Sequence, residues 1–213
     1  MRTVLKPALI ALGLGAATMA SGSALAADKT NPDWPCVQKK IESLSAGQSW
    51  DGPAVETDKV PWADDEKIKD LIAVLTSRRV PLPDAEVAVK KFADGVPAAE
   101  RDAKLTLLFA GLFETSNAQR KTVIGGLEKY LKAQRDRGKI VEQKGVELDE
   151  LRQKSGTDEA AEMAVAKAEE AFNWETRIFQ ERQQNIPVAC EIPIMIEQRL
   201  YDLVKVIRSA MSK

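Results

Sequence analysis

The sequence predicts an all-α protein with a compact helical body and a long antiparallel helical hairpin. From about residue 64 onward, apolar residues recur at the spacing of amphipathic helices. No stretch shows the strict alternation of apolar and polar residues that is typical of a β-strand. Residues 117–154 contain no proline, which favours one long helical arm. We expect a helical domain over residues 64–213, with the hairpin at residues 117–186.

The first 26 residues have the features of an export signal. Arg2 and Lys6 give a basic start, an apolar stretch follows, and residues 24–26 read Ala-Leu-Ala, the small-x-small pattern of a cleavage site. The apolar stretch contains glycine, serine and threonine, so it is a weak candidate for a membrane anchor. We expect cleavage after Ala26, no membrane insertion of the remaining chain, and the bacterial periplasm as its destination.

The charge balance excludes one class of partner. The chain has 31 Lys and Arg against 32 Asp and Glu, a net charge of −1. Residues 1–26 hold two basic residues and no acidic residue, so their removal shifts the net charge from −1 to −3. A mildly acidic protein lacks the basic patch that binds phosphate backbones, and we expect no nucleic-acid partner.

The chain has two cysteines, Cys36 and Cys190. In an oxidising compartment a single pair of cysteines is expected to form a disulfide. A catalytic thiolate usually needs a general base, and the chain contains no histidine and no Cys-x-x-Cys motif. We therefore predict a disulfide between Cys36 and Cys190 rather than a nucleophile or a metal ligand.

Residues 27–63 form a distinct segment that is rich in proline and holds three of the four tryptophans, Trp34, Trp50 and Trp62. We expect one short helix, Pro35–Leu44, followed by irregular chain. Because buried indoles contribute strongly to packing, the segment is expected to cover the helical body. The alternative is that the tryptophans form a stacking platform for a sugar or an aromatic ligand.

Several helices are predicted in the body. Ile68, Leu71, Ile72 and Leu75 mark the first, behind an acidic turn at residues 64–66. Asp84 is expected to cap the second, which has Ala85, Ala88, Val89 and Phe92 on one side. Residues 105–113 are apolar nearly all round, which indicates a central buried helix.

The hairpin arms and their boundaries follow from local signals. Ser116 and Gln119 match a capping box, which favours a new helix direction there; a continuous kinked helix is the alternative. A short turn at 155–158 requires the two arms to pack antiparallel. Pro187 is expected to end the second arm, and a separate final helix is expected over Pro193–Met211.

Glycines inside the first arm need an explanation, because glycine weakens a helix. Gly138 and Gly145 are expected to allow close approach to alanines on the second arm. Gly125 and Gly126 are interpreted as a kink or a close helix contact rather than a phosphate-binding loop.

The absence of histidine is the most informative feature of the composition. It excludes Ser-His-Asp and Cys-His catalysis and histidine-ligated zinc, copper or haem. Acidic residues gather near the hairpin tip, but their spacing matches no calcium loop, so we interpret them as solvated helix faces; they are Glu147, Asp149, Glu150, Glu159, Glu162, Glu169 and Glu170. We expect no metal and no cofactor, and an enzyme is the less favoured class.

The sequence favours an exported, non-enzymatic interaction or accessory protein whose hairpin binds another protein of the cell envelope. The alternative is a small-molecule-binding helical bundle, or a histidine-free enzyme, with its site beneath Trp34, Trp50 and Trp62. Glu114 and Arg120 would contribute to that site because they flank the most apolar helix. Their structural interpretation is a buried ion pair or a capping interaction.

Overall fold

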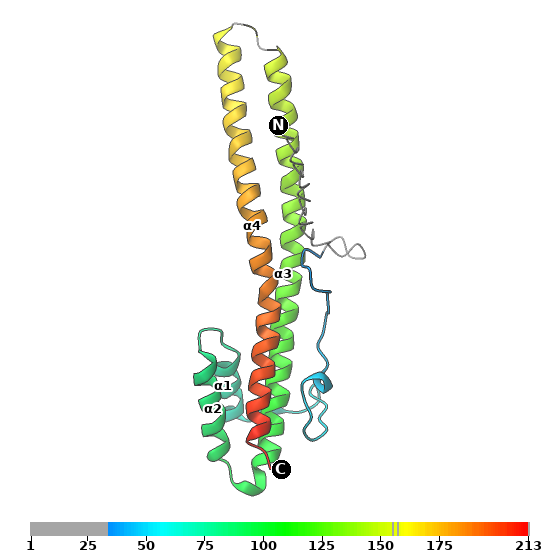
Figure 1. Cartoon of the computed structure of the whole chain (residues 1–213), viewed down its shortest axis with the longest axis vertical. Coiled ribbons are helices and arrows are strands. Elements are labelled where there is room, and N and C mark those ends of the chain that lie inside the picture. The colour runs from blue at the N-terminus through cyan, green and yellow to red at the C-terminus, as the bar shows by residue number, and fades with distance from the viewer. Residues whose placement is uncertain (1–33, 155, 157, 213) are drawn as a thin grey trace, which may run out of the picture.

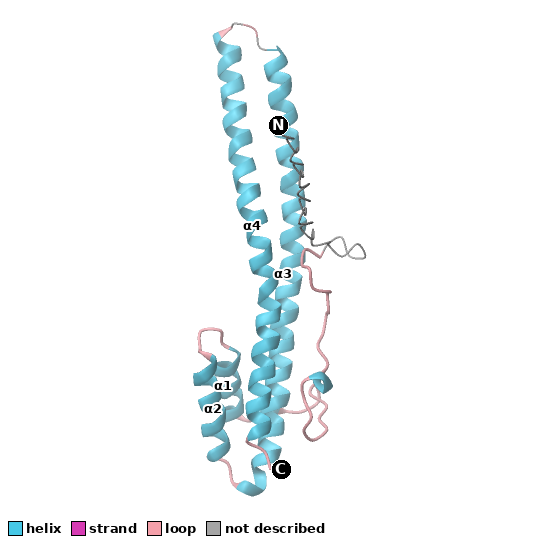
Figure 2. Ribbon diagram, in the orientation of Figure 1, coloured by secondary structure: helices cyan, strands magenta, loops and turns pink. Residues whose placement is uncertain are grey.

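The computed structural model describes residues 34–154, 156 and 158–212. Within these residues the secondary structure consists of four α-helices and two short 3₁₀ turns, with no strand. The predicted all-α class is confirmed (Figure 2). The predicted signal, residues 1–26, lies outside the described residues.

Two long helices set the shape of the molecule. α3, Ala98–Lys154, and α4, Glu159–Ser209, run antiparallel along the whole length of the structure (Figure 1). A straight helix of 57 residues, the length of α3, spans about 85 Å at 1.5 Å per residue. The shorter α1, Glu66–Thr76, and α2, Leu82–Asp94, flank this pair at one end, and the irregular N-terminal chain lies on its other side (Figure 1).

The main core lies where α1, α2 and the C-terminal part of α4 meet the first third of α3. The predicted central apolar run is buried here, since Leu105, Leu108 and Phe109 have no exposed surface. Facing residues come from the other three helices: Ile68, Ile72, Leu75, Ala85, Val89, Leu200, Leu203, Val204 and Ile207. Beyond this region α3 and α4 have mainly each other to pack against.

The start of α1 is fixed by Asp65. Its Oδ1 accepts hydrogen bonds from the backbone N–H groups of Lys67, at 3.1 Å, and Ile68, at 3.2 Å. Its Oδ2 accepts from Lys104 Nζ on α3 at 2.7 Å. The hydrogen bond from Lys104 holds the pKa of Asp65 below its ordinary value. One carboxylate therefore caps α1 and ties it to α3.

The predicted start of α2 is one turn too late. α2 begins at Leu82 after Pro81, and Asp84 lies in its first turn instead of capping it. Pro83 fits this position because the first-turn N–H groups of a helix have no intrahelical partner. Ala85 and Val89 are buried as expected.

The predicted break at Ser116–Gln119 is wrong, because α3 continues through it. A capping box helps only where backbone N–H groups lack a helical partner. Inside α3 those groups are already bonded, and Phe113, Ser116 and Ile124 are buried along the one element. Packing on both sides of the motif therefore outweighs the local signal.

The predicted helix end at Pro187 and the separate helix over Pro193–Met211 are also wrong. α4 runs continuously through both prolines to Ser209. Each proline removes one backbone hydrogen bond, a cost of about 3 kcal/mol in an isolated helix. Ile186, Cys190 and Ile196 are buried around the prolines, so tertiary packing keeps the helix together across them.

The glycines of α3 differ in their surroundings. A Cβ at Gly138 would lie 3.4 Å from the ring of Phe179, and one at Gly145 would lie 3.3 Å from the ring of Phe172. The small residues therefore accommodate aromatic rings of α4, not alanines. A Cβ at Gly125 or Gly126 would meet no atom within 4 Å, so of the two interpretations given, a kink or a close helix contact, the close contact is wrong.

Two alanine substitutions in α3 should have opposite effects on the free energy of unfolding. At Gly111 a Cβ would collide with Ile72 Cδ1 and lie 2.6 Å from the Trp62 ring, so Gly111→Ala should destabilise the protein by about 1–3 kcal/mol. At Gly125 the space is open, so Gly125→Ala should stabilise it by up to about 1 kcal/mol through helix propensity. Urea denaturation of both variants measures the difference, and equal changes would contradict the packing described for Gly111.

Candidate functional site

Residues 34–45, here called the strap, do not form the predicted helix Pro35–Leu44. They run as an irregular chain along α3 and α4 (Figure 1). Side chains of the long helices bind the strap's backbone in place of helical hydrogen bonds. Arg120 donates to the carbonyl of Ile41, and Asn117 Oδ1 accepts from the N–H of Leu44 at 3.0 Å. These partners explain why an irregular conformation is stable here.

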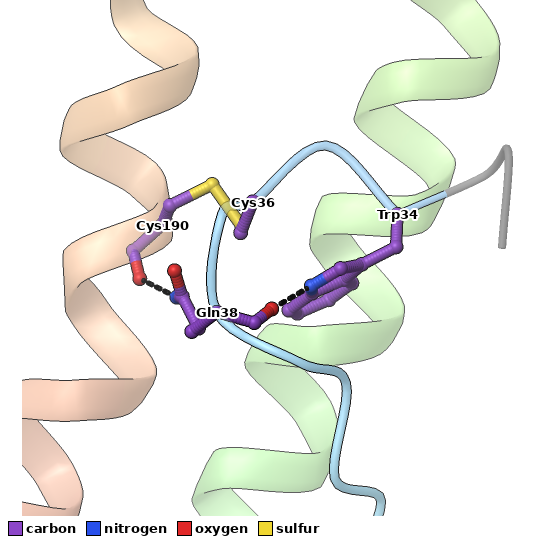
Figure 3. Close-up of a disulfide and its surroundings, with 4 residues drawn as sticks. All are labelled: Trp34, Cys36, Gln38 and Cys190. Carbon is purple, nitrogen blue, oxygen red and sulfur yellow. Dashed lines mark hydrogen bonds between the residues drawn. A yellow bond between two sulfur atoms is a disulfide. The ribbon is translucent and has the colours of Figure 1, made fainter. Parts of the chain in front are cut away.

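The strap is joined covalently to α4. Cys36 and Cys190 form the predicted disulfide, with their Cα atoms 5.5 Å apart. Gln38 Nε2 donates to the carbonyl of Cys190 at 2.6 Å, and the indole N–H of Trp34 donates to the carbonyl of Gln38 at 2.5 Å (Figure 3). Lys40 Nζ contacts Glu128 of α3 at 2.6 Å. The hydrogen bond with Glu128 raises the pKa of Lys40 above its ordinary value.

The disulfide lies in a second, smaller core between the long helices. Its buried members are Trp34, Cys36, Ile124, Leu127, Ile186 and Cys190. Trp34 is 2 % exposed, so its indole is a packing element and has little surface left for a ligand. A buried disulfide of this kind is compatible with a location outside the cytoplasm.

The other two tryptophans of the N-terminal segment pack on the main core. Trp50 stacks on Phe109 with ring centroids 4.0 Å apart, and its indole N–H donates to the carbonyl of Pro53 at 2.8 Å. Trp62 lies over Gly111 and donates from its indole N–H to Glu114 Oε2 at 2.6 Å. The predicted covering role of the segment matches these contacts.

Glu114 and Arg120 do not pair with each other. Glu114 is exposed and holds Trp62, whereas Arg120 is 4 % exposed and donates from Nε to Glu197 Oε1 on α4. Arg120 instead forms a partly buried ion pair with Glu197, a partner that the sequence does not predict. This arginine links the strap, α3 and α4 at one point.

The five candidate ligand-site residues are thus spread over two cores. Trp34 belongs to the second core, Trp50 and Trp62 to the edge of the first, and Arg120 lies beneath the strap. Beside Glu114 there is an open groove of about 270 Å³, lined by polar residues such as Asn117 and Lys121. This volume is slightly below the usual range of small-molecule pockets, about 300–1,000 Å³.

A different surface stands out on the hairpin. Trp174 of α4 is 55 % exposed, with Arg177 over its ring at 4.6 Å from the centroid. It lines an open groove of about 920 Å³ along α4 and Lys144 of α3. Ile140, Val146 and Met163 are exposed on the same two arms. Trp174 is therefore a large apolar side chain that contributes little to the packing of the helices.

The sequence contains a signal for the exposure of Trp174. The inner seam of α4, which faces α3, includes Ala168, Phe172 and Phe179, and Trp174 falls two residues from Phe172, on the far side of a helix with 3.6 residues per turn. A tryptophan opposite a packed seam is exposed unless another element covers it.

Ion pairs join the arms of the hairpin. Arg137 pairs with Glu175, and Arg152 contacts Glu169 at 3.2 Å. Over the described residues, no three cysteine or carboxylate side chains gather in a way that would hold a metal ion. Among those residues there is also no helix with the length and apolar character needed to cross a membrane.

Comparison with known proteins gives no relative. The chain matches no protein-family model, no curated protein and no solved structure.

Removal of the disulfide should strongly destabilise the protein. The bond joins residues 154 positions apart, and the Cys36→Ser, Cys190→Ser double variant should lose about 2–5 kcal/mol of unfolding free energy because the unfolded chain regains its freedom. Urea denaturation followed by circular dichroism measures the loss. Wild-type protein under reducing conditions is the control and should match the variant; an unchanged midpoint in both would refute the stabilising role.

Loss of the charge on Glu197 should leave Arg120 buried without a counter-ion. Glu197→Gln is expected to lower the unfolding free energy by about 2–3 kcal/mol, somewhat less than for a fully buried pair because the Glu197 side chain is 37 % exposed. The matched control is Glu150→Gln, whose pair with Lys154 is exposed at both ends and should change stability by less than about 0.5 kcal/mol. Similar midpoints for the two variants in urea would show that Arg120 does not depend on this carboxylate.

Proposed function

We propose that the protein is an exported, non-enzymatic interaction protein that binds another protein of the cell envelope through the hairpin formed by α3 and α4. The observation that carries this proposal is the exposed Trp174 groove, on arms that no other described segment covers. The Cys36–Cys190 disulfide supports export, because such bonds persist in oxidising compartments.

The hairpin has little core of its own. Beyond Leu127, the buried residues of α3 are Gln134 and Leu148, and the first buried residue of α4 is Ile186. Two helices alone bury one face each and leave the other faces in water. Among the described residues nothing adds a third layer here, and a partner would supply one. Helical partners dock on such surfaces through a few apolar anchors.

Trp174 has the properties of an anchor. Tryptophan and arginine are enriched among the residues that dominate binding energy at interfaces, and here Arg177 already stacks on the ring. Lys144, Lys167 and Glu170 line the same groove and make no ion pair among the described residues. A partner with mixed charge around an apolar contact would complement this surface.

The alternative function, binding of a small molecule beneath the N-terminal tryptophans, has weaker support. Trp34 is buried, and the groove beside Glu114 is open and small.

Substitution of Trp174 should weaken partner binding. A photo-crosslinking residue placed at position 163 identifies the partner in the envelope, and the purified pair is then titrated. Trp174→Ala is expected to weaken binding by at least about 10-fold, as for an interface anchor. The control is Tyr201→Ala on the same helix, since Tyr201 is 50 % exposed and has Lys205 at 4.0 Å over its ring.

Two results would reject the proposal. One is equal affinity of Trp174→Ala and wild type for the crosslinked partner. The other is crosslinking of position 163 to a second copy of the chain, because the hairpin would then serve self-association instead of binding another protein.

A further inference from the structure

A second region of the molecule has the features of a binding site. It lies where the C-terminal end of α1 meets α3 and α4. Two cavities meet there and share the lining residues Thr76, Arg78, Gln119 and Ile196. The outer one is an open groove of about 300 Å³, and the inner one is a small cavity of about 20 Å³ that reaches Arg199.

Arg199 is not fully satisfied by the protein. Its Nε donates to the carbonyl of Leu75 at 2.6 Å, which covers the C-terminal end of α1. Its Nη2 is buried and has no hydrogen-bond partner. Burial lowers the pKa of Arg199 below the ordinary arginine value, as expected for a cation without a nearby counter-charge. A buried, unbonded guanidinium N–H is costly, so a partner of opposite charge would stabilise it.

The charged residues that line the two cavities are basic. Arg78 is exposed at the mouth and forms no ion pair among the described residues. The side-chain amide of Gln119 adds a hydrogen-bonding group. No acidic side chain lines either cavity, although the chain as a whole carries more acidic than basic residues. Val123 and Ile196 supply an apolar wall beside these donors.

We propose that Arg78 and Arg199 bind the oxyanion of a small ligand, a carboxylate or a phosphate monoester that carries a short apolar group. The planar guanidinium recognises both anions through paired N–H donors. One oxygen of the anion would enter the inner cavity, which has about 20 Å³, and accept from Arg199. The rest of the ligand would lie in the outer groove, with Arg78 supplying the charge and Val123 with Ile196 the contact for the apolar group. This site is separate from the Trp174 groove and does not depend on the function proposed for the hairpin.

A single water in the inner cavity is the competing explanation. A volume of about 20 Å³ is enough for one water molecule, which would bond Arg199 Nη2 without any ligand. This explanation gives no role to Arg78 and predicts no saturable anion binding.

The test is a calorimetric titration of the whole purified protein with butyrate and, separately, with propyl phosphate, at constant ionic strength set with sodium chloride. Arg78→Gln should weaken binding by about 10-fold or more, the effect of losing a charged hydrogen bond. Arg79→Gln is the matched control, because Arg79 is the neighbouring exposed arginine and lines neither cavity. It should bind like wild type.

Each outcome decides the proposal. Saturable 1:1 binding that Arg78→Gln weakens and Arg79→Gln retains supports it, and the tighter of the two ligands identifies the anion class. A shift of the Arg199 Nε–Hε resonance during the titration would place the anion at the inner cavity. The proposal would be overturned if neither ligand saturated the protein at concentrations up to about 10 mM. It would also be overturned if Arg78→Gln and Arg79→Gln lost affinity equally.

Discussion

Antiparallel packing of α3 against α4 is the constraint on which the rest of the structure depends. The two helices bury one face each against the other, and every other element attaches to this pair: α1 and α2 on one side, the strap on the other. The strap closes the arrangement. The Cys36–Cys190 bond and the Arg120 interactions with Ile41 and Glu197 tie an irregular segment to both long helices at one level. Covalent and ionic links act here because a chain without regular structure contributes few hydrogen bonds of its own.

Buried side chains are concentrated at one end of the molecule and are few toward the hairpin tip. At one end four helices enclose the main core, and the second core, around the disulfide, lies next to it in the direction of the hairpin tip. Toward the hairpin tip burial falls away, until Leu148 is the last buried side chain of α3. A two-helix layer offers long exposed faces on a rigid support, which suits recognition of a large partner better than enclosure of a substrate. The proposed role of the Trp174 groove follows from this division.

The two proposed sites differ in the physics of recognition. The Trp174 groove is open, and its binding energy would come from covering an exposed aromatic ring. The Arg78–Arg199 site is partly enclosed, and its energy would come from pairing a buried donor that lacks a partner. The second site lies close to Arg120 in sequence and space, since Gln119 is its neighbour on α3. An anion bound there would bridge the connection between α1 and α2, which holds Arg78, to α3 and α4.

The sequence by itself determined the helical class, the disulfide and the buried run at residues 105–113, because the apolar period, the count of two cysteines and local hydrophobicity are properties of the chain.

Tertiary structure decided where helices continue and which side chains remain exposed. Ser116, Pro187 and Pro193 give strong local signals for a helix boundary, yet packing of two long faces outweighs a lost hydrogen bond or an unused cap. Conversely, Pro35–Leu44 gives a helical signal and forms no helix, since the disulfide and the side chains of α3 hold it in an irregular conformation. The helical period places Trp174 opposite the packed seam, but whether another element covers it is decided by the tertiary structure. The unbonded Arg199 Nη2 depends on neighbours distant in sequence, which no local pattern encodes.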